Sequence, residues 1–395
     1  MFQPVRIHSY TATSCLGAGL EAQRRALREN RGGLRPCDFP GVTLDTWIGR
    51  VEGLEDLRIR GDLAAYDCRN NRLALLGLEQ DGFMEAVATA RRRYGRHRIG
   101  IFLGTSTSGV EQSEQAYARR NPAGELPAEY HYRTTQNTFS VADFTRRILD
   151  LAGPAQVVST ACSSSAKVFA SAARYLDAGL CDAAVVGGVD SLCQMTLYGF
   201  HSLQLVSSSP CRPADPQRDG INIGEAAGFA LLERSGEAGG LALLGYGESS
   251  DAHHMSAPHP EGEGAIRAMQ QALARAGLEA SHIDYITLHG TATPANDRAE
   301  DRAVFRLFQG KVPCSSTKGF TGHTLGAAGI LGMACAGIAI EEGLLPASLN
   351  TRQVDAAIRS PIVLSPVRQT VRRVMCNAFG FGGNNASLIL GWTES

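Results

Sequence analysis

A cysteine between a β-branched stretch and a run of small residues is the first candidate for chemistry. Val157 and Val158 lead into Ser-Thr-Ala-Cys-Ser-Ser-Ser, in which the cysteine is residue 162. This pattern is typical of a strand that turns sharply into a helix. At a helix start, the dipole and the unpaired N–H groups would lower the pKa of the Cys162 thiol toward neutrality. Cys162 is therefore a candidate nucleophile, and the alternative is an unreactive core cysteine.

A histidine at the end of an apolar stretch is the second candidate. His289 is followed by Gly-Thr-Ala-Thr, at a position where α/β folds place ligand-binding loops. Thr291 and Thr293 could offer hydroxyl groups to a polar substrate arm. The alternative is a structural histidine followed by a helix cap at Asn296 or Asp297.

A lysine and a second histidine precede a helix rich in glycine and alanine. Lys318 and His323 lie five residues apart, and the phosphate-loop order of glycines, lysine and serine or threonine is absent. Small residues would let backbones pack closely around His323. The alternative is a tightly packed buried helix with a capped start.

A glycine-rich segment near the C-terminus is the fourth candidate. Residues 377–385 read Asn-Ala-Phe-Gly-Phe-Gly-Gly-Asn-Asn. This glycine density indicates unusual backbone angles and N–H groups that could form an oxyanion hole. The alternative is a simple hairpin loop between two strands.

Strands that alternate with helices must position these residues. Apolar runs predict strands at Val5–Tyr10, Ile99–Leu103, Gln156–Ser159, Ala183–Val186, Ile283–Leu288, Arg373–Cys376 and Ser387–Leu390. Helical patterns lie at Asp81–Arg93, Val141–Leu151, Ser163–Ala178, Ala265–Ala276 and Ala299–Gln309. The alternation predicts an α/β protein with largely parallel, buried sheets. A similar rhythm in the two halves of the chain hints at an internal duplication.

Composition narrows the classes of protein. A net charge of −1 argues against a nucleic-acid binder. The ten cysteines form no C-x-x-C pair, which favours reduced core cysteines and a cytoplasmic location. The N-terminus shows no signal-peptide pattern. The longest apolar run, Leu325–Ile340, is shorter than the roughly 20 residues of a membrane span, so we expect a buried helix and no span.

The four segments, taken together and in this order, resemble the β-ketoacyl-[acyl-carrier-protein] synthases. More narrowly, they resemble the Cys-His-His branch of the thiolase-like condensing enzymes. The matching segments are Thr160–Ser165, His289–Pro294, Lys318–Gly329 and Phe379–Gly383. The chain departs from the family spelling at Ala226, Ala292, Gly319, Phe320 and Asn384, and none of these changes removes a reacting group.

The resemblance implies a five-layered α/β/α/β/α fold of two similar halves. Residues 1–240 would carry the nucleophile, and residues 241–395 would carry the two histidines. It also implies a homodimer, or a heterodimer with a homologous synthase. The partner protein would be acyl carrier protein bearing acyl and malonyl groups.

The resemblance also assigns the catalytic roles. Cys162 would accept an acyl group, and His289 and His323 would stabilise the enolate left when the malonyl group loses carbon dioxide. Lys318 would tune His323 and pair with Glu300. This chemistry requires no metal and no organic cofactor.

Binding roles follow from the same resemblance. The backbone N–H groups of Cys162 and Phe379 would form the oxyanion hole, and Phe379 would also gate the nucleophile. Thr291 and Thr293 would hold the pantetheine arm. Thr107 and Phe200 would line the acyl pocket.

Two further expectations concern the partner and the pathway. Carrier proteins are usually acidic, so a basic patch should lie at the tunnel mouth. Arg69 and Arg72 are candidates for it, with a solvated helix face as the alternative. The Gly-Thr-Ser-Thr-Ser-Gly spelling of residues 104–109 resembles synthases of aryl polyene or related polyketide-like clusters.

Single residues argue against three alternative assignments of function. A thiolase would use a second cysteine near the C-terminus, but Cys376 reads as a strand residue. The Cys-His-Asn branch of synthases is disfavoured by the motif of Lys318 and His323. A non-catalytic chain-length-factor-like subunit usually lacks the nucleophile, whereas Cys162 is present.

Overall fold

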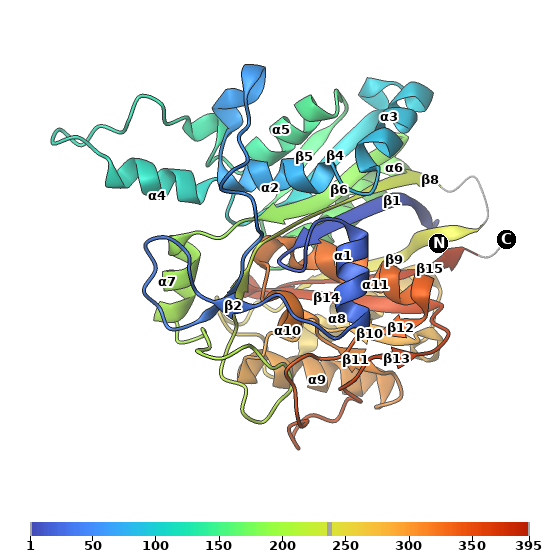
Figure 1. Ribbon diagram of the computed structural model, residues 1–395. Coiled ribbons are helices and arrows are strands. Elements are labelled where there is room, and N and C mark those ends of the chain that lie inside the picture. The colour runs from blue at the N-terminus through green and yellow to red at the C-terminus, as the bar shows by residue number, and fades with distance from the viewer. Residues whose placement is uncertain (1, 235–238, 394–395) are drawn as a thin grey trace.

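The computed structural model describes residues 2–234 and 239–393, and its centre is a ten-stranded sheet (Figure 1). The strands follow the order β11-β10-β14-β15-β9-β1-β8-β6-β4-β5. Their bounds are β1 Val5–Ser14, β4 Ile99–Gly104, β5 Ala155–Val158, β6 Ala183–Asp190, β8 Ala226–Arg234, β9 Gly240–Ser250, β10 Tyr285–Thr287, β11 Cys314–Ser315, β14 Arg373–Gly380 and β15 Asn384–Thr393.

The sheet consists of two five-stranded halves with the same pattern of pairing. In the order β5-β4-β6-β8-β1 the first two pairs are parallel and the next two antiparallel. The order β11-β10-β14-β15-β9 repeats this pattern. The halves meet where β1 pairs with β9 through Val5–Leu243 and Arg6–Ala242. This repeat supports the internal duplication, and we keep the division of the chain after residue 240 as a proposal.

The predicted parallel character of the sheet is wrong. Five of the nine neighbouring strand pairs are antiparallel, including β14 with β15 and β8 with β6. Helices cover both faces of the sheet, so its antiparallel strands are apolar on both sides as parallel ones usually are. An apolar run alone therefore could not distinguish the two directions.

Helices form three layers around the two half-sheets. The middle layer contains α6 (Ser164–Asp177) and α11 (Ala328–Glu342), which contact each other. One outer layer contains α2 (Arg69–Leu78), α3 (Phe83–Tyr94) and α5 (Ser140–Ile148), and the other contains α8 (Glu263–Ala276) and α9 (Pro294–Phe308) (Figure 1). This is the five-layered arrangement that the resemblance implied.

The two middle helices approach closely because small residues meet there. A Cβ atom at Gly329 would lie 2.4 Å from the backbone nitrogen of Ala166. The segment Leu325–Glu342, which includes α11, is long and apolar enough to cross a membrane, with a mean hydropathy of 1.4, so the expectation that it is too short for a span is wrong. It is mostly buried between the half-sheets, so the expectation of a buried helix is confirmed.

Shorter elements connect these layers. They are α1 Leu20–Arg28, β2 Arg35–Pro36, β3 Trp47–Gly49, α4 Val110–Ala118, α7 Gln194–Ser202, β7 Ile223–Gly224, α10 Lys318–Thr321, β12 Leu344–Leu345 and β13 Val367–Arg368. All seven predicted strands and all five predicted helices are present. The largest shift is in α9, which begins five residues earlier than predicted because Pro294 suits the first turn of a helix.

Candidate active site

Cys162 and His323 occupy corresponding places in the two halves. Cys162 lies between β5 and α6, and His323 lies between β11 and α11. Both are therefore close to the N-terminal ends of the middle helices. Ala161 has a φ of 52°, in the left-handed region that residues with a Cβ seldom adopt. This sharp turn presents the Cys162 thiol between the two halves.

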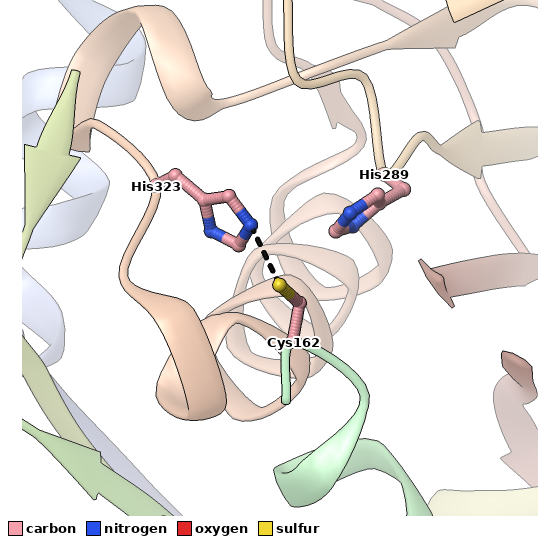
Figure 2. A group of neighbouring side chains, drawn as sticks. All are labelled: Cys162, His289 and His323. Atoms are coloured by element: carbon pink, nitrogen blue, oxygen red, sulfur yellow. Dashed lines mark hydrogen bonds between the residues drawn. The ribbon is translucent and has the colours of Figure 1, made fainter. Parts of the chain in front are cut away.

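The predicted trio of Cys162, His289 and His323 comes together in the structure (Figure 2). His323 Nε2 lies 3.0 Å from Cys162 Sγ, and the two imidazole rings lie 5.3 Å apart. All three side chains are buried. Their donor atoms lie within 4.8 Å of one another, so two imidazoles and a thiolate are the described residues that could hold a metal ion such as zinc.

Both histidines are held as neutral hydrogen-bond donors. Burial and the Lys318 charge lower the pKa of each imidazole well below its ordinary value. The Leu325 N–H donates to His323 Nδ1 at 3.2 Å, so the ring proton is on Nε2. Lys318 Nζ lies 3.5 Å from His289 Nδ1, and because an ammonium group can only donate, this neighbour favours the tautomer with the proton on Nε2. The site thus has two Nε2–H donors beside the thiol.

The pKa of the Cys162 thiol is raised, whereas the sequence predicted that it would be lowered. Burial raises the pKa of the thiol to about 11. The Lys318 charge and the backbone N–H groups of Phe381 and Cys162 act in the opposite direction, but burial outweighs them. The predicted shift toward neutrality is therefore wrong for the resting site, in which Cys162 is a protonated thiol at neutral pH.

Glu300 organises the backbone around His289. Its two carboxylate oxygens accept the N–H groups of His289 at 2.8 Å and Gly290 at 2.7 Å. Burial raises its pKa to about 7. Lys318 does not contact this carboxylate directly, because it donates to the His289 carbonyl oxygen. Its charge still opposes the rise in the pKa of Glu300, so the predicted pairing holds only at a distance. Lys318 does lower the pKa of His323, as predicted, and it also lowers that of His289.

A cavity of about 270 Å³ opens in front of the trio. Four of the predicted binding residues line it, namely Thr291, Thr293, Phe200 and Phe379. The two threonine hydroxyls lie 2.9 Å from each other at one side of the cavity. Most of the remaining lining is apolar, which suits a substrate with a hydrocarbon part and a polar end.

The glycine loop contains a functional residue that the sequence reasoning missed. The backbone N–H of Phe381 points at the Cys162 sulfur, and the Phe381 ring packs 5.5 Å from Phe200 in the cavity wall. Phe379 lies inside β14, and its ring packs against His289. The N–H donor expected of Phe379 is therefore that of Phe381, and because both rings line the cavity, the gate beside the nucleophile stays a prediction. The available signal was its glycine neighbours on both sides, of which Gly382 has a φ of 77°.

Three other predicted positions are not among the residues that line the cavity. Thr107 is buried, and its hydroxyl donates to Asp190 at 2.9 Å, so it does not line the cavity. Arg69 is buried in an ion pair with Glu225 at 2.6 Å. Arg72 pairs with Asp67 at 2.6 Å. Neither arginine offers a free charge to a partner, because α2 packs on the sheet and turns these side chains toward acidic neighbours.

Family models match most of the chain. Residues 73–238 match the N-terminal domain of beta-ketoacyl synthase, and residues 241–352 match its C-terminal domain. The chain belongs to the β-ketoacyl synthase family. The order of the matched domains agrees with the order of the nucleophile and the two histidines in the site.

Individual proteins that are similar in sequence to this chain agree with the family assignment. Nodulation protein E of Rhizobium meliloti (strain 1021) is 31% identical over 394 residues, which cover 94% of this chain and 95% of the relative. The 3-oxoacyl-[acyl-carrier-protein] synthase 2 of the same strain is 40% identical over 258 residues, or 61% of each chain. The mitochondrial 3-oxoacyl-[acyl-carrier-protein] synthase of Arabidopsis thaliana is 39% identical, over 60% of this chain and 56% of the relative. The chain thus matches about three fifths of the length of these two synthases.

Solved structures confirm the thiolase-like ketosynthase fold. A chain in the complex of a ketosynthase with its chain length factor from Xenorhabdus doucetiae is 39% identical, with a TM-score of 0.90 over 99% of this chain and 98% of the other. The ishigamide ketosynthase/chain length factor gives 27% identity and a TM-score of 0.88 over 99% and 100%.

Proposed function

We propose that this protein is a β-ketoacyl-[acyl-carrier-protein] synthase that performs decarboxylative Claisen condensation. The observation that carries this proposal is the convergence of a thiol and two neutral Nε2–H donors on one apolar cavity. Such donors suit a reaction in which negative charge develops on a thioester oxygen.

In the first half-reaction Cys162 takes the acyl group from a carrier protein. The thiol attacks the thioester carbon, a new C–S bond forms, and the C–S bond to the carrier breaks. The proton of Cys162 passes to the departing pantetheine sulfur, so the step needs no external base. The N–H groups of Phe381 and Cys162 stabilise the oxyanion, and the loss of one such donor typically costs about 3–4 kcal/mol.

In the second half-reaction a malonyl thioester enters and its carboxylate leaves as carbon dioxide. His289 and His323 donate Nε2–H bonds to the enolate oxygen that forms. The enolate carbon attacks the acyl carbon and a C–C bond forms, while the C–S bond to Cys162 breaks and releases a 3-oxoacyl thioester on the carrier. Cys162 leaves as a thiolate and takes one proton from solvent to return to its resting thiol form. Thr291 and Thr293 would hold the pantetheine arm at the cavity wall.

The partner and the pathway are part of the proposal. We propose acyl carrier protein as the substrate carrier, a cytoplasmic location and a product of fatty-acid or of polyene or polyketide type. Pairing with a second chain of this family, either a copy or a chain length factor, is supported by the complexes of the two solved relatives. The intact Cys162 favours this chain as the catalytic member of such a pair over the chain-length-factor reading.

The intact mass of the protein after incubation with a panel of acyl carrier proteins tests the nucleophile. We expect one acyl adduct on the wild-type chain and none on Cys162→Ala. The acyl group taken up fastest would identify the substrate class. An adduct that survives the substitution, or none with any donor, would contradict the assignment of Cys162.

A further inference from the structure

The carboxylate of Asp190 accepts six hydrogen bonds, an unusually large number for one side chain. The residue ends β6 and is fully buried. One oxygen accepts the hydroxyl groups of Thr105 and Thr107 and the N–H groups of Ser106 and Thr107, at 2.7 to 2.9 Å. The other oxygen accepts the Ser106 hydroxyl and the Gly326 N–H, the latter at 2.5 Å. A buried carboxylate with this many donors is a fixed anchor for the groups around it.

The Asp190 carboxylate connects the two halves of the molecule close to the catalytic residues. The segment Thr105–Thr107 follows β4 in the N-terminal half, whereas Gly326 belongs to the turn after His323 in the C-terminal half. A Cβ atom at Gly326 would lie only 2.7 Å from the Asp190 carboxylate. Glycine therefore permits this approach, and the contact fixes the peptide between Leu325 and Gly326.

The preceding peptide, between Thr324 and Leu325, carries the N–H group that sets the tautomer of His323, and it is joined to the fixed peptide through the Leu325 Cα atom. The Leu325 N–H donates to His323 Nδ1 at 3.2 Å. Leu325 has a φ of 51°, a left-handed conformation that is unfavourable for a residue with a side chain and needs support from its surroundings. The Asp190 bond to the next residue, Gly326, supplies that support.

We infer that Asp190 is a positioning residue for His323. By holding Gly326 it directs the Leu325 N–H at Nδ1, and so it keeps the ring proton on Nε2, where it faces Cys162 and the cavity. The consequence for catalysis rests on the proposed condensation, in which that proton is donated to the enolate. The consequence for the tautomer does not depend on it.

Asp190→Asn tests this inference, because the amide presents an NH₂ group to donors that now meet a carboxylate. We expect the decarboxylation rate of malonyl carrier protein to fall about 100-fold, the size of effect that a misplacement of about 1 Å produces. Ser106→Ala is the matched control, because it removes a donor to the same carboxylate and leaves the Gly326 contact. We expect Ser106→Ala to stay within about threefold of the wild type. Equal losses in both variants would overturn the inference.

The ring ¹⁵N shifts of His323 give a readout that a merely structural role would not move. They can be assigned by the signal lost in His323→Gln. We expect Nε2–H in the wild type and a mixture of the two tautomers in Asp190→Asn. A wild type with the proton on Nδ1 would overturn the inference even if Asp190→Asn does not fold. If the tautomer behaves as expected but the wild type does not decarboxylate malonyl carrier protein, the proposed function fails and the positioning role stands.

Discussion

At the scale of single residues, burial sets the ionisation of Cys162. The pKa of about 11 means that the thiol, rather than the thiolate, awaits the substrate. The rate of alkylation by iodoacetamide at Cys162 should therefore rise about tenfold per pH unit from pH 7 to 9.5 without a plateau, because the thiolate fraction controls it. Cys162→Ala provides the background from the other nine cysteines. A plateau below pH 8.5 would contradict this account.

Lys318 supplies the positive charge that opposes burial at Cys162 and depresses both histidine pKa values. Lys318→Met keeps the stem and removes the charge. We expect a higher pKa at Cys162, hence slower alkylation at fixed pH, and higher pKa values at His289 and His323. Alkylation kinetics and histidine titration by NMR measure the two effects. Unchanged values for both would show that Lys318 is neutral in the wild type.

Glu300 makes stability depend on pH in a defined window. Below about pH 4.5 its carboxyl group is protonated in both states. Between 4.5 and about 7 the unfolded chain releases the proton while the folded chain keeps it. The folded state then binds more protons, so this group makes stability fall as pH rises.

Glu300→Gln removes that titration. The free energy of unfolding of the wild type minus that of Glu300→Gln should decrease from pH 4.5 to 7, as measured by urea unfolding at several pH values. Carboxyl groups that do not interact with Glu300 cancel in this difference, whereas Asp297 is coupled to it. A difference that is constant with pH would show that Glu300 has an ordinary pKa in the folded protein.

At the scale of elements, the contact between α6 and α11 sets the distance between nucleophile and histidine. Gly329→Ala would force its new methyl group against Ala166 in the neighbouring helix. Such overpacking typically costs about 1–3 kcal/mol. We expect this loss in urea unfolding, together with slower acylation of Cys162.

Gly199→Ala in α7 is the matched control for Gly329→Ala. No atom outside its chain neighbours and its own helix backbone lies within 4 Å of the added methyl group, so the substitution should be neutral or stabilise the helix by up to about 1 kcal/mol. Equal destabilisation by both substitutions would remove the special role of the interhelical contact.

The sequence predicted the reacting groups and most elements, but not the directions of side chains. Cys162, His289 and His323 stand in local motifs that can be read along the chain. Whether Phe379 or Phe381 faces the thiol depends on where β14 ends and the glycine loop begins. Arg69 and Thr107 were misjudged because their partners, Glu225 and Asp190, lie far away in the chain and only folding brings them together.

At the scale of the whole molecule, a duplicated half-sheet explains the layout of the site. Each half carries its middle-layer helix after its edge strand, β5 or β11, and the starts of these helices bring Cys162 and His323 together. In the sequence the repeat was indicated only by a similar alternation of strands and helices in the two halves. Apolar runs predict where strands lie but not their direction or their order in a sheet. Each half alone lacks a reacting group, so catalysis depends on their junction.

The condensation itself is tested most directly by the mass of the carrier protein after incubation with acyl carrier protein, malonyl carrier protein and the enzyme. We expect a 3-oxoacyl carrier protein, longer than the acyl donor by two carbons, with release of one carbon dioxide, and no such product with Cys162→Ala. Product formation by Cys162→Ala, or a wild type that forms the acyl adduct but never the longer product with any acyl donor, would contradict it.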